Sequence, residues 1–269
     1  MQKLKRFSLL LLFLFTLPIA IGQLPFPNNE VSPKPKEPAH VVFAASQAPA
    51  QQPAIQSTDP FHVLLFYTHS HESYKPVVAQ SKGLQAVYDE QTNIYSMQEM
   101  MQYYFNLNQI TTTVMDFDAM TEMKTTGAAF HQAYDVVRPV LKEKLSQQPF
   151  DLVIDFHRDS APSSVTTLEL NGERYAKVAF VVGAEHAGYS SNLAYATALS
   201  EQLNRMVPGI SRGIMKKQGK GVDGVYNQDL SPEMLLIEFG GIDNNDEELQ
   251  RTMAVLAQAI QKAFIEMAV

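Results

Sequence analysis

The feature that most constrains the fold is an alternation of short apolar runs with stretches whose apolar residues recur every three to four positions. Short apolar runs bounded by polar or turn residues are typical of buried β-strands, whereas the longer periodicity is typical of amphipathic helices. The predicted strands cover residues 63–67, 152–156, 178–182 and 234–237, with a weaker one at 111–115. The predicted helices cover residues 97–105, 130–145, 193–206 and 249–264. Strands that alternate with helices favour an α/β domain with a mostly parallel sheet flanked by helices.

The dipeptide Asn171-Gly172 interrupts this alternation. Asn-Gly between two strand-forming runs is a strong signal for a two-residue β-hairpin. We therefore expect residues 165–170 to pair with the strand at 178–182, which would make one edge of the sheet antiparallel. The predicted fold class is α/β, with a mixed, mostly parallel sheet flanked by helices.

The prolines divide the chain into two kinds of sequence. Eight of the 15 prolines lie in residues 23–60. A segment so rich in Pro, Ala and Gln buries little apolar surface, so we predict a disordered spacer over residues 23–60. The remaining residues, 61–269, are long enough to form one domain with a substantial core.

The N-terminal residues have the pattern of an export signal. Three basic residues lie within the first six positions and precede a continuous apolar run over residues 7–21. Such a run is short for a spanning helix, which needs about 17–25 residues, and has the length of a signal-peptide core. Residues 1–22 are therefore predicted to be either a cleaved signal peptide or a signal anchor. Both alternatives predict export of the domain to the extracytoplasmic face of the cell membrane, where it would be either anchored or secreted.

Composition excludes several kinds of chemistry. The chain has no Cys, which excludes disulfides, thiol nucleophiles and thiolate metal sites, so any metal must be bound by His, Asp or Glu. The formal net charge is −7, and binding to nucleic acid needs a basic surface. We therefore predict no nucleic-acid partner.

Ionisable residues follow three of the predicted strands at the point where each strand ends. His69 and Glu72 follow the first strand, His157 follows the second, and Glu238 closes the last. In an open α/β sheet the ligand crevice lies beyond the carboxyl ends of the strands. We therefore expect these side chains, which are far apart in the sequence, to form one site.

These residue types are those of a hydrolytic zinc site. Two imidazoles and one carboxylate hold a catalytic Zn²⁺ and leave a position for water, while a second carboxylate acts as general base. We assign His69, Glu72 and His157 as ligands and Glu238 as the catalytic base. His71 remains an alternative third ligand, because residues two apart in an extended stretch point the same way.

Five motifs between about residues 61 and 266 together resemble the stage II sporulation protein P family. They are THSHESYKP at 68–76, IDFHRD at 154–159, VVG at 181–183, YNQDL at 226–230 and LIEFG at 236–240. The family is similar to zinc-dependent N-acetylmuramoyl-L-alanine amidases, so the resemblance implies a zinc amidase-like fold and a catalytic amidase domain over residues 61–269. It also implies cleavage of the bond between the glycan and the stem peptide of peptidoglycan, and cross-link endopeptidase activity is ascribed to the family too. Its members are membrane-anchored and act in sporulation engulfment alongside the stage II sporulation proteins D and M.

The resemblance implies the same roles for His69, His157 and Glu238, with Glu72 as the third zinc ligand. Three loop residues are predicted to bind substrate. Arg158 and Asp159 directly follow a ligand, and the guanidinium can hold a stem-peptide carboxylate with two hydrogen bonds. Asn227 lies in the glycine-flanked segment 219–229, which is predicted to form a mobile wall of the groove.

Two other functions fit the same residues. The order H-x-x-E, a later His and a still later Glu also occurs in metallocarboxypeptidases, so a zinc carboxypeptidase or endopeptidase acting on stem peptides is one alternative. A metal-free scaffold that binds peptidoglycan is another. The products released from peptidoglycan and the metal content of the protein distinguish these three hypotheses.

Overall fold

A computed structural model describes residues 60–265 of the chain. The predicted signal segment, residues 1–22, and the predicted spacer, residues 23–60 apart from Pro60, lie outside the described residues. Within residues 60–265, no helix has the length and apolar character needed to cross a bilayer.

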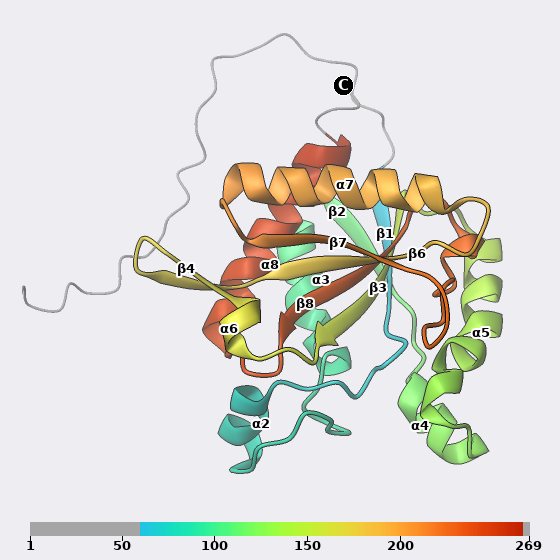
Figure 1. The fold of residues 1–269 in the computed structure, drawn as a ribbon, viewed down its shortest axis with the longest axis horizontal. Coiled ribbons are helices and arrows are strands. Elements are labelled where there is room, and N and C mark those ends of the chain that lie inside the picture. Colours follow the sequence, from blue (N-terminus) through green and yellow to red (C-terminus); the bar gives the residue numbers. More distant parts are fainter. Residues whose placement is uncertain (1–59, 266–269) are drawn as a thin grey trace, which may run out of the picture. The chain divides into compact units, whose positions relative to one another are not determined.

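The described residues form a six-stranded sheet with the strand order β2-β1-β3-β8-β6-β7 (Figure 1). Strands β2, β1, β3 and β8 are parallel to one another, β6 is antiparallel to β8, and β7 is parallel to β6. This confirms the predicted α/β fold with a mixed, mostly parallel sheet. The strands are β1 (Phe61–Phe66), β2 (Ile110–Val114), β3 (Leu152–Asp159), β6 (Val178–Gly183), β7 (Ser211–Lys217) and β8 (Met234–Gly241).

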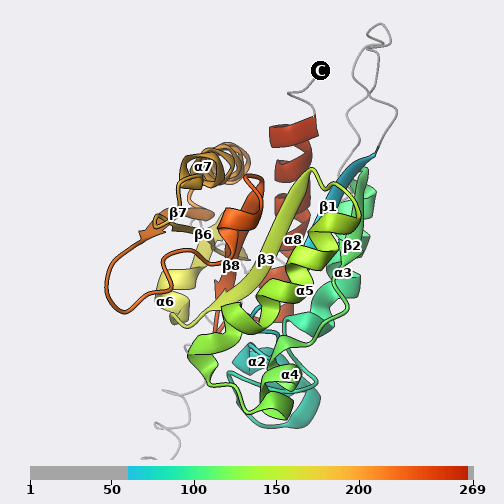
Figure 2. The same ribbon diagram turned by 90° about the vertical axis from the view of Figure 1, so that its right-hand side faces the viewer.

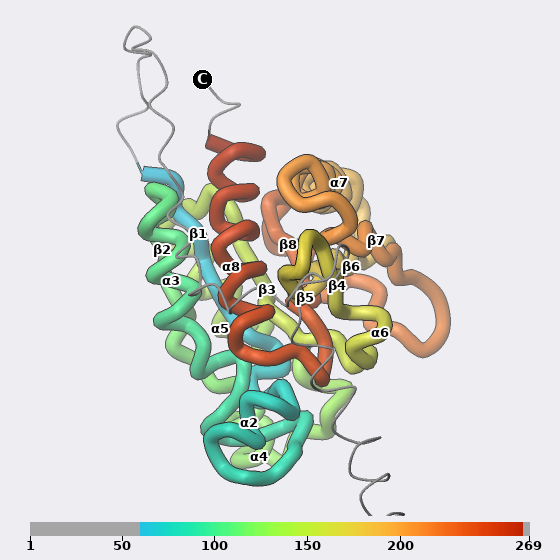
Figure 3. The backbone as a smooth tube through the Cα atoms, turned by 90° about the vertical axis from the view of Figure 1, so that its left-hand side faces the viewer, coloured from blue at the N-terminus to red at the C-terminus, as the bar shows by residue number. Residues whose placement is uncertain are grey.

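Helices cover both faces of the sheet, because successive residues of the buried strands point to opposite faces. Val63 and Leu65 of β1 pack in the core beneath α3, α7 and α8, whereas Leu64 and Phe66 pack in the core beneath α4 and α5. Figure 2 shows α5 on the opposite side of β3 from α8, and Figure 3 shows α3 beside α8. The long helices are α3 (Gln98–Leu107), α4 (Ala119–Thr126), α5 (Ala133–Gln147), α7 (Tyr189–Met206) and α8 (Asp246–Ile260).

Shorter elements connect these layers. They are α2 (Lys75–Lys82), α6 (Ser163–Thr166), the 3₁₀ turns η1 (Tyr95–Met97), η2 (Phe130–Gln132) and η3 (Gln228–Leu230), and the π-helical turn η4 (Gln261–Ile265). Three of these elements follow the carboxyl ends of β1 or β2 in the chain, namely α2, η1 and η2. They therefore lie near the same end of the sheet.

The predicted partner of the hairpin strand is wrong. Asn171-Gly172 does form a tight turn with both residues at positive φ, but it joins β4 (Thr167–Leu170) to β5 (Glu173–Ala176) in a separate two-stranded sheet. The strand at 178–183 cannot accept that hairpin, because β8 and β7 occupy its two edges. The antiparallel pair of the main sheet is therefore β6 with β8, inside the sheet, and not an edge.

A second difference is a strand that the sequence pattern does not predict. Residues 211–217 form β7, the edge strand beside β6. Its side chains are mostly only partly buried, and an edge strand does not need the continuous apolar run that marks a central strand of a parallel sheet.

Candidate active site

The register of the sheet places the three predicted strand ends together. Asp155 of β3 pairs with the last residue of β1, and His157 of β3 pairs with Glu238 of β8. The loop that follows β1, residues 67–72, is called here the β1 loop. Candidate residues from three distant parts of the sequence therefore lie at one end of the sheet.

The start of the β1 loop is fixed by a buried carboxylate. The Asp155 side chain is 1% exposed and accepts hydrogen bonds from the Thr68 backbone N–H, at 2.9 Å, and from the Thr68 hydroxyl, at 2.7 Å. The loop then turns, and the Glu72 N–H donates to the His69 carbonyl at 2.9 Å. This turn carries both His69 and Glu72 to the end of β3.

The His157 imidazole lies between two carboxylates. Its Nε2 is 3.0 Å from Asp155 Oδ1 and its Nδ1 is 3.7 Å from Glu72 Oε2. Glu72 Oε2 also accepts a 2.8 Å hydrogen bond from the Arg158 N–H, which holds the Glu72 side chain against β3. The His69 ring lies edge to face with the His157 ring, with centroids 5.3 Å apart. His69, Glu72 and His157 are therefore neighbours, with Asp155 on the far side of His157.

Several of these polar atoms are buried without a hydrogen-bond partner in the described structure. They include His69 Nδ1, His157 Nε2 and Glu238 Oε2, and the contact of His157 with Asp155 is close but not aligned as a hydrogen bond. Leaving a buried polar atom unpaired costs about 1–3 kcal/mol, so native proteins seldom do so outside functional sites. His157 Nε2 faces Asp155, so the two remaining atoms, His69 Nδ1 and Glu238 Oε2, indicate a place where a ligand is bound.

Burial shifts the protonation of this group. Burial, and then the charge of His157, lower the pKa of His69 to about 3. Burial raises the pKa of Glu238 to about 7, although the charge of His157 acts in the opposite direction. Burial also raises the pKa of Glu72. Burial alone would lower the pKa of His157. The neighbouring carboxylates, Asp155 foremost, outweigh that effect and raise this pKa to about 9. The site therefore disfavours ionised carboxylates unless a positive charge accompanies them.

Aromatic rings surround the two imidazoles. Phe130 of η2 stacks on His69 with centroids 4.4 Å apart, and Tyr134 of α5 contacts His69 edge to face and His157 in a stacked arrangement. Phe130 and Tyr88 are half exposed and touch each other at the mouth of the site. Neither ring could be assigned to the site from the sequence, since Phe130 and Tyr134 match the helical core periodicity and carry no local sign of a site.

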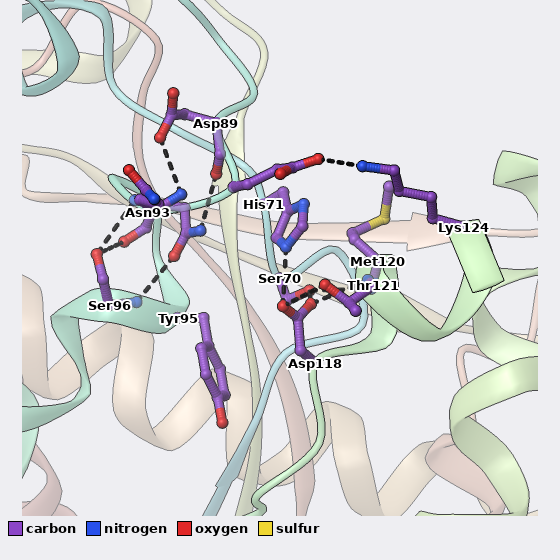
Figure 4. A network of polar contacts seen from close by, with 12 residues as sticks. Ser70, His71, Asp89, Asn93, Tyr95, Ser96, Asp118, Met120, Thr121 and Lys124 are labelled. Carbon is purple, nitrogen blue, oxygen red and sulfur yellow. Dashed lines mark hydrogen bonds and ion pairs between the residues drawn. The ribbon is translucent and has the colours of Figure 1, made fainter. Parts of the chain in front are cut away.

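His71 is bound to Asp118 in a separate network of polar contacts (Figure 4). Its Nε2 is 2.9 Å from Asp118 Oδ2, on the side of α4. The expectation that His69 and His71 point the same way is wrong, because residues 68–71 form a turn and not an extended strand. Of the two alternatives for the third ligand, the structure places Glu72 beside His157 and His71 beside Asp118.

Arg158 and Asp159 are both engaged within the protein. Arg158 is 2% exposed, donates to the Val87 carbonyl at 2.7 Å and lies over the Tyr88 ring, although its Nε is buried without a partner. Asp159 forms a 2.5 Å ion pair with Arg212 of β7. Substrate binding by these two residues stays a prediction.

Asn227 and its neighbour Gln228 anchor the predicted wall. The side-chain oxygen of Asn227 accepts from the Arg138 guanidinium at 3.0 Å, and its side-chain N–H₂ donates to the Tyr134 backbone carbonyl at 2.9 Å. The buried Gln228 side chain bonds to the backbone of β6. These bonds tie segment 219–229 to α5 and β6, so the polar atoms of Asn227 already have partners within the fold, and its role toward substrate stays a prediction.

The donor set fits zinc by its chemistry. Two imidazoles and a carboxylate are the ligands that a hydrolytic zinc site uses, and Nδ1 of His69 is buried without a partner. Across residues 60–265, no three His, Asp or Glu side chains are already arranged around one point as a metal cage. The fold thus gathers the donors at one place without closing them around an ion.

Two solved structures are similar in fold to this chain at low sequence identity. The CwlD amidase of Clostridioides difficile, solved in complex with the GerS lipoprotein, has a TM-score of 0.47 and 14% identity, and the match covers 76% of this chain and 98% of that one. The N-acetylmuramyl-L-alanine amidase Ami1 of Mycobacterium smegmatis has a TM-score of 0.45 and 13% identity, with 77% and 97% covered. Similarity at this level transfers no residue roles.

Sequence comparison is more specific. The stage II sporulation protein P of Bacillus subtilis (strain 168) is 36% identical over 206 residues, which are 76% of this chain and 50% of that protein. This chain thus spans about half the length of its relative. The family model for stage II sporulation protein P matches residues 27–261, a range that contains all five motifs. The chain therefore belongs to the stage II sporulation protein P family, as its motifs predicted.

Proposed function

We propose that this protein is a zinc-dependent peptidoglycan hydrolase that cleaves the amide between N-acetylmuramic acid and the stem peptide, with cross-link endopeptidase activity as a second reaction. One observation carries this proposal. His69, Glu72, His157 and Glu238 lie together at the carboxyl ends of β1, β3 and β8, and His69 Nδ1 and Glu238 Oε2 are buried without a partner. That set is what metal-assisted amide hydrolysis requires, and it occurs in a chain of a sporulation family.

His69, Glu72 and His157 would hold the zinc ion. When bound, the ion supplies a Lewis acid and makes a water molecule acidic enough to attack an amide near neutral pH. Asp155 orients the His157 ring from behind, which is the usual task of a carboxylate beside a ligating imidazole. Phe130 and Tyr134 exclude bulk water from His69, and burial keeps its imidazole neutral, which is the form that can ligate.

Glu238 moves the proton. Its buried Oε2 has no partner in the fold, and burial raises its pKa to about 7. A carboxylate with a pKa near the working pH can accept a proton from the attacking water and pass it to the departing amine nitrogen. The amide bond breaks as the amine leaves, and the carboxylate returns to its ionised form.

The proposed setting follows from the family. The substrate is peptidoglycan, the place of action is the extracytoplasmic face of the cell membrane, and the role is in sporulation engulfment. The stage II sporulation proteins D and M are the proposed partners there. Residues 1–22 would direct export, either as a cleaved signal or as an anchor.

Digestion of purified sacculi tests this function. The purified protein is incubated with sacculi with and without the zinc chelator 1,10-phenanthroline, and the released products are identified by mass. We expect free stem peptides with an intact N-terminal Ala, no release with chelator, and recovery when zinc is added back. Trimmed peptides as the sole products would identify a carboxypeptidase or endopeptidase instead. A folded, zinc-free protein that binds sacculi but releases nothing would identify a scaffold.

A further inference from the structure

We propose that Asp118 is a positioning residue for the active site: it holds the β1 loop so that His69 and Glu72 face His157. The inference rests on the proposed zinc-dependent function, and it concerns a residue that has no described contact with His69, Glu72 or His157 and lies in no motif of the family resemblance. Its basis is a network of hydrogen bonds between the β1 loop and the first turn of α4 (Figure 4).

Asp118 is itself held firmly in place. It is the N-cap residue of α4, and its carboxylate accepts from the Thr121 N–H at 3.2 Å and from the Thr121 hydroxyl at 2.8 Å. A helix N-terminus has backbone N–H groups without partners, and a capping carboxylate satisfies them. The side chain therefore has a fixed direction before the β1 loop is considered.

The same carboxylate binds two consecutive residues of the β1 loop. The Ser70 hydroxyl donates to Asp118 Oδ1 at 2.6 Å, and His71 Nε2 lies 2.9 Å from Asp118 Oδ2. In return, the Met120 N–H donates to the Ser70 hydroxyl oxygen at 3.1 Å. Ser70 and His71 stand between His69 and Glu72 in the chain, so fixing the middle pair fixes the directions of the outer pair.

The opposite edge of the loop is held mostly through its backbone carbonyls. The Asp89 N–H and the Ser73 hydroxyl donate to the His71 carbonyl, both at 3.0 Å, and the Ile94 N–H donates to the Glu72 carbonyl at 2.8 Å. Among the loop side chains, that of Glu72 is held by the Arg158 N–H. Asp118 adds a side-chain anchor at the middle of the loop, just as Asp155 anchors its start through Thr68.

This network gives Ser70 and His71 a function that the family motif alone does not explain. Residues that orient metal ligands through hydrogen bonds typically change metal affinity by about 10–100-fold when they are replaced. His71 is then part of the support of the site, since its Nε2 is already bound to Asp118.

Zinc affinity, measured by competition with a chromogenic chelator, tests the proposal. Asp118→Asn keeps the helix cap, because Asn is as good an N-cap as Asp, but puts an amide N–H₂ against one of the two loop donors. We expect zinc binding that is weaker by about 10–100-fold, with circular dichroism like that of the wild type. The matched control is Asn245→Ala, which removes the exposed N-cap of α8. It should lower the melting temperature and leave zinc affinity unchanged.

Ser70→Ala keeps the proposal testable if Asp118→Asn fails to fold. It removes the Ser70 bonds to Asp118 and to the Met120 N–H but leaves the bonds between Asp118 and Thr121 intact, and it should weaken zinc binding in the same direction. Variants that fold and bind zinc as tightly as the wild type would overturn this inference alone. A wild-type protein that binds no zinc would overturn the proposed function, and this inference with it.

Discussion

Glu238→Gln is expected to lower the rate of stem-peptide release from purified sacculi by about 10²–10⁴-fold, the usual contribution of a general acid–base residue. The amide keeps the size of the side chain and cannot take up a proton from water. Burial raises the pKa of Glu238 to about 7, so an assay at pH 8 compares an ionised wild-type carboxylate with a neutral amide. Product release followed by mass spectrometry is the measurement.

The stability of Glu238→Gln separates catalysis from folding. Because the pKa of Glu238 is higher in the folded state than in the unfolded chain, ionisation of this carboxyl opposes folding progressively as the pH rises from its ordinary pKa to about 7. The variant should therefore melt no lower than the wild type at pH 8. Glu201→Gln, on the exposed face of α7, is the control and should keep wild-type activity. Glu238→Gln activity within tenfold of the wild type would rule out the assigned role.

Asp155→Ala is expected to reduce the free energy of unfolding by about 3–5 kcal/mol, the usual cost of breaking a buried charge pair. Asp155 is 1% exposed, lies 3.0 Å from His157 Nε2 and accepts two hydrogen bonds from Thr68. Removing the carboxylate leaves the two Thr68 donors without their partner and takes the nearest negative charge away from His157. Urea unfolding followed by far-ultraviolet circular dichroism measures the loss, since the chain has no Trp for fluorescence.

Asp151→Ala is the matched control, four positions earlier in the chain. Asp151 is exposed and accepts one hydrogen bond, from the His62 N–H at 2.7 Å. An exposed Asp with one such bond should cost no more than about 1 kcal/mol. If the two variants lost equal amounts of unfolding free energy, Asp155 would not have the special role at the start of the β1 loop that its contacts indicate.

The strands and their ends could be predicted because the signals are local. The runs that became β1, β3 and β8 are mostly apolar, as expected for strands buried on both faces. A parallel sheet then aligns their carboxyl ends, so His69, His157 and Glu238 could be placed together although they are far apart in the chain.

The remaining features depend on contacts between distant residues. The antiparallel direction of β6 follows from its place between β8 and β7, and no pattern in residues 178–183 encodes it. Which way His71 points is decided by Asp118, which lies in another element. The stacking of Phe130 on His69 depends on how η2 meets the β1 loop, whereas in sequence Phe130 is one more apolar residue at helical spacing.

The metal content of the purified protein is the sharpest test of the proposed zinc-dependent function. Elemental analysis compares the zinc content of the wild type with that of His157→Ala, which lacks the central imidazole of the donor set. Circular dichroism confirms that both proteins are folded. We expect one zinc ion per wild-type chain and none in the variant. A wild-type protein that is free of zinc and releases stem peptides in the presence of chelator, or a variant that retains the full zinc content, would contradict it.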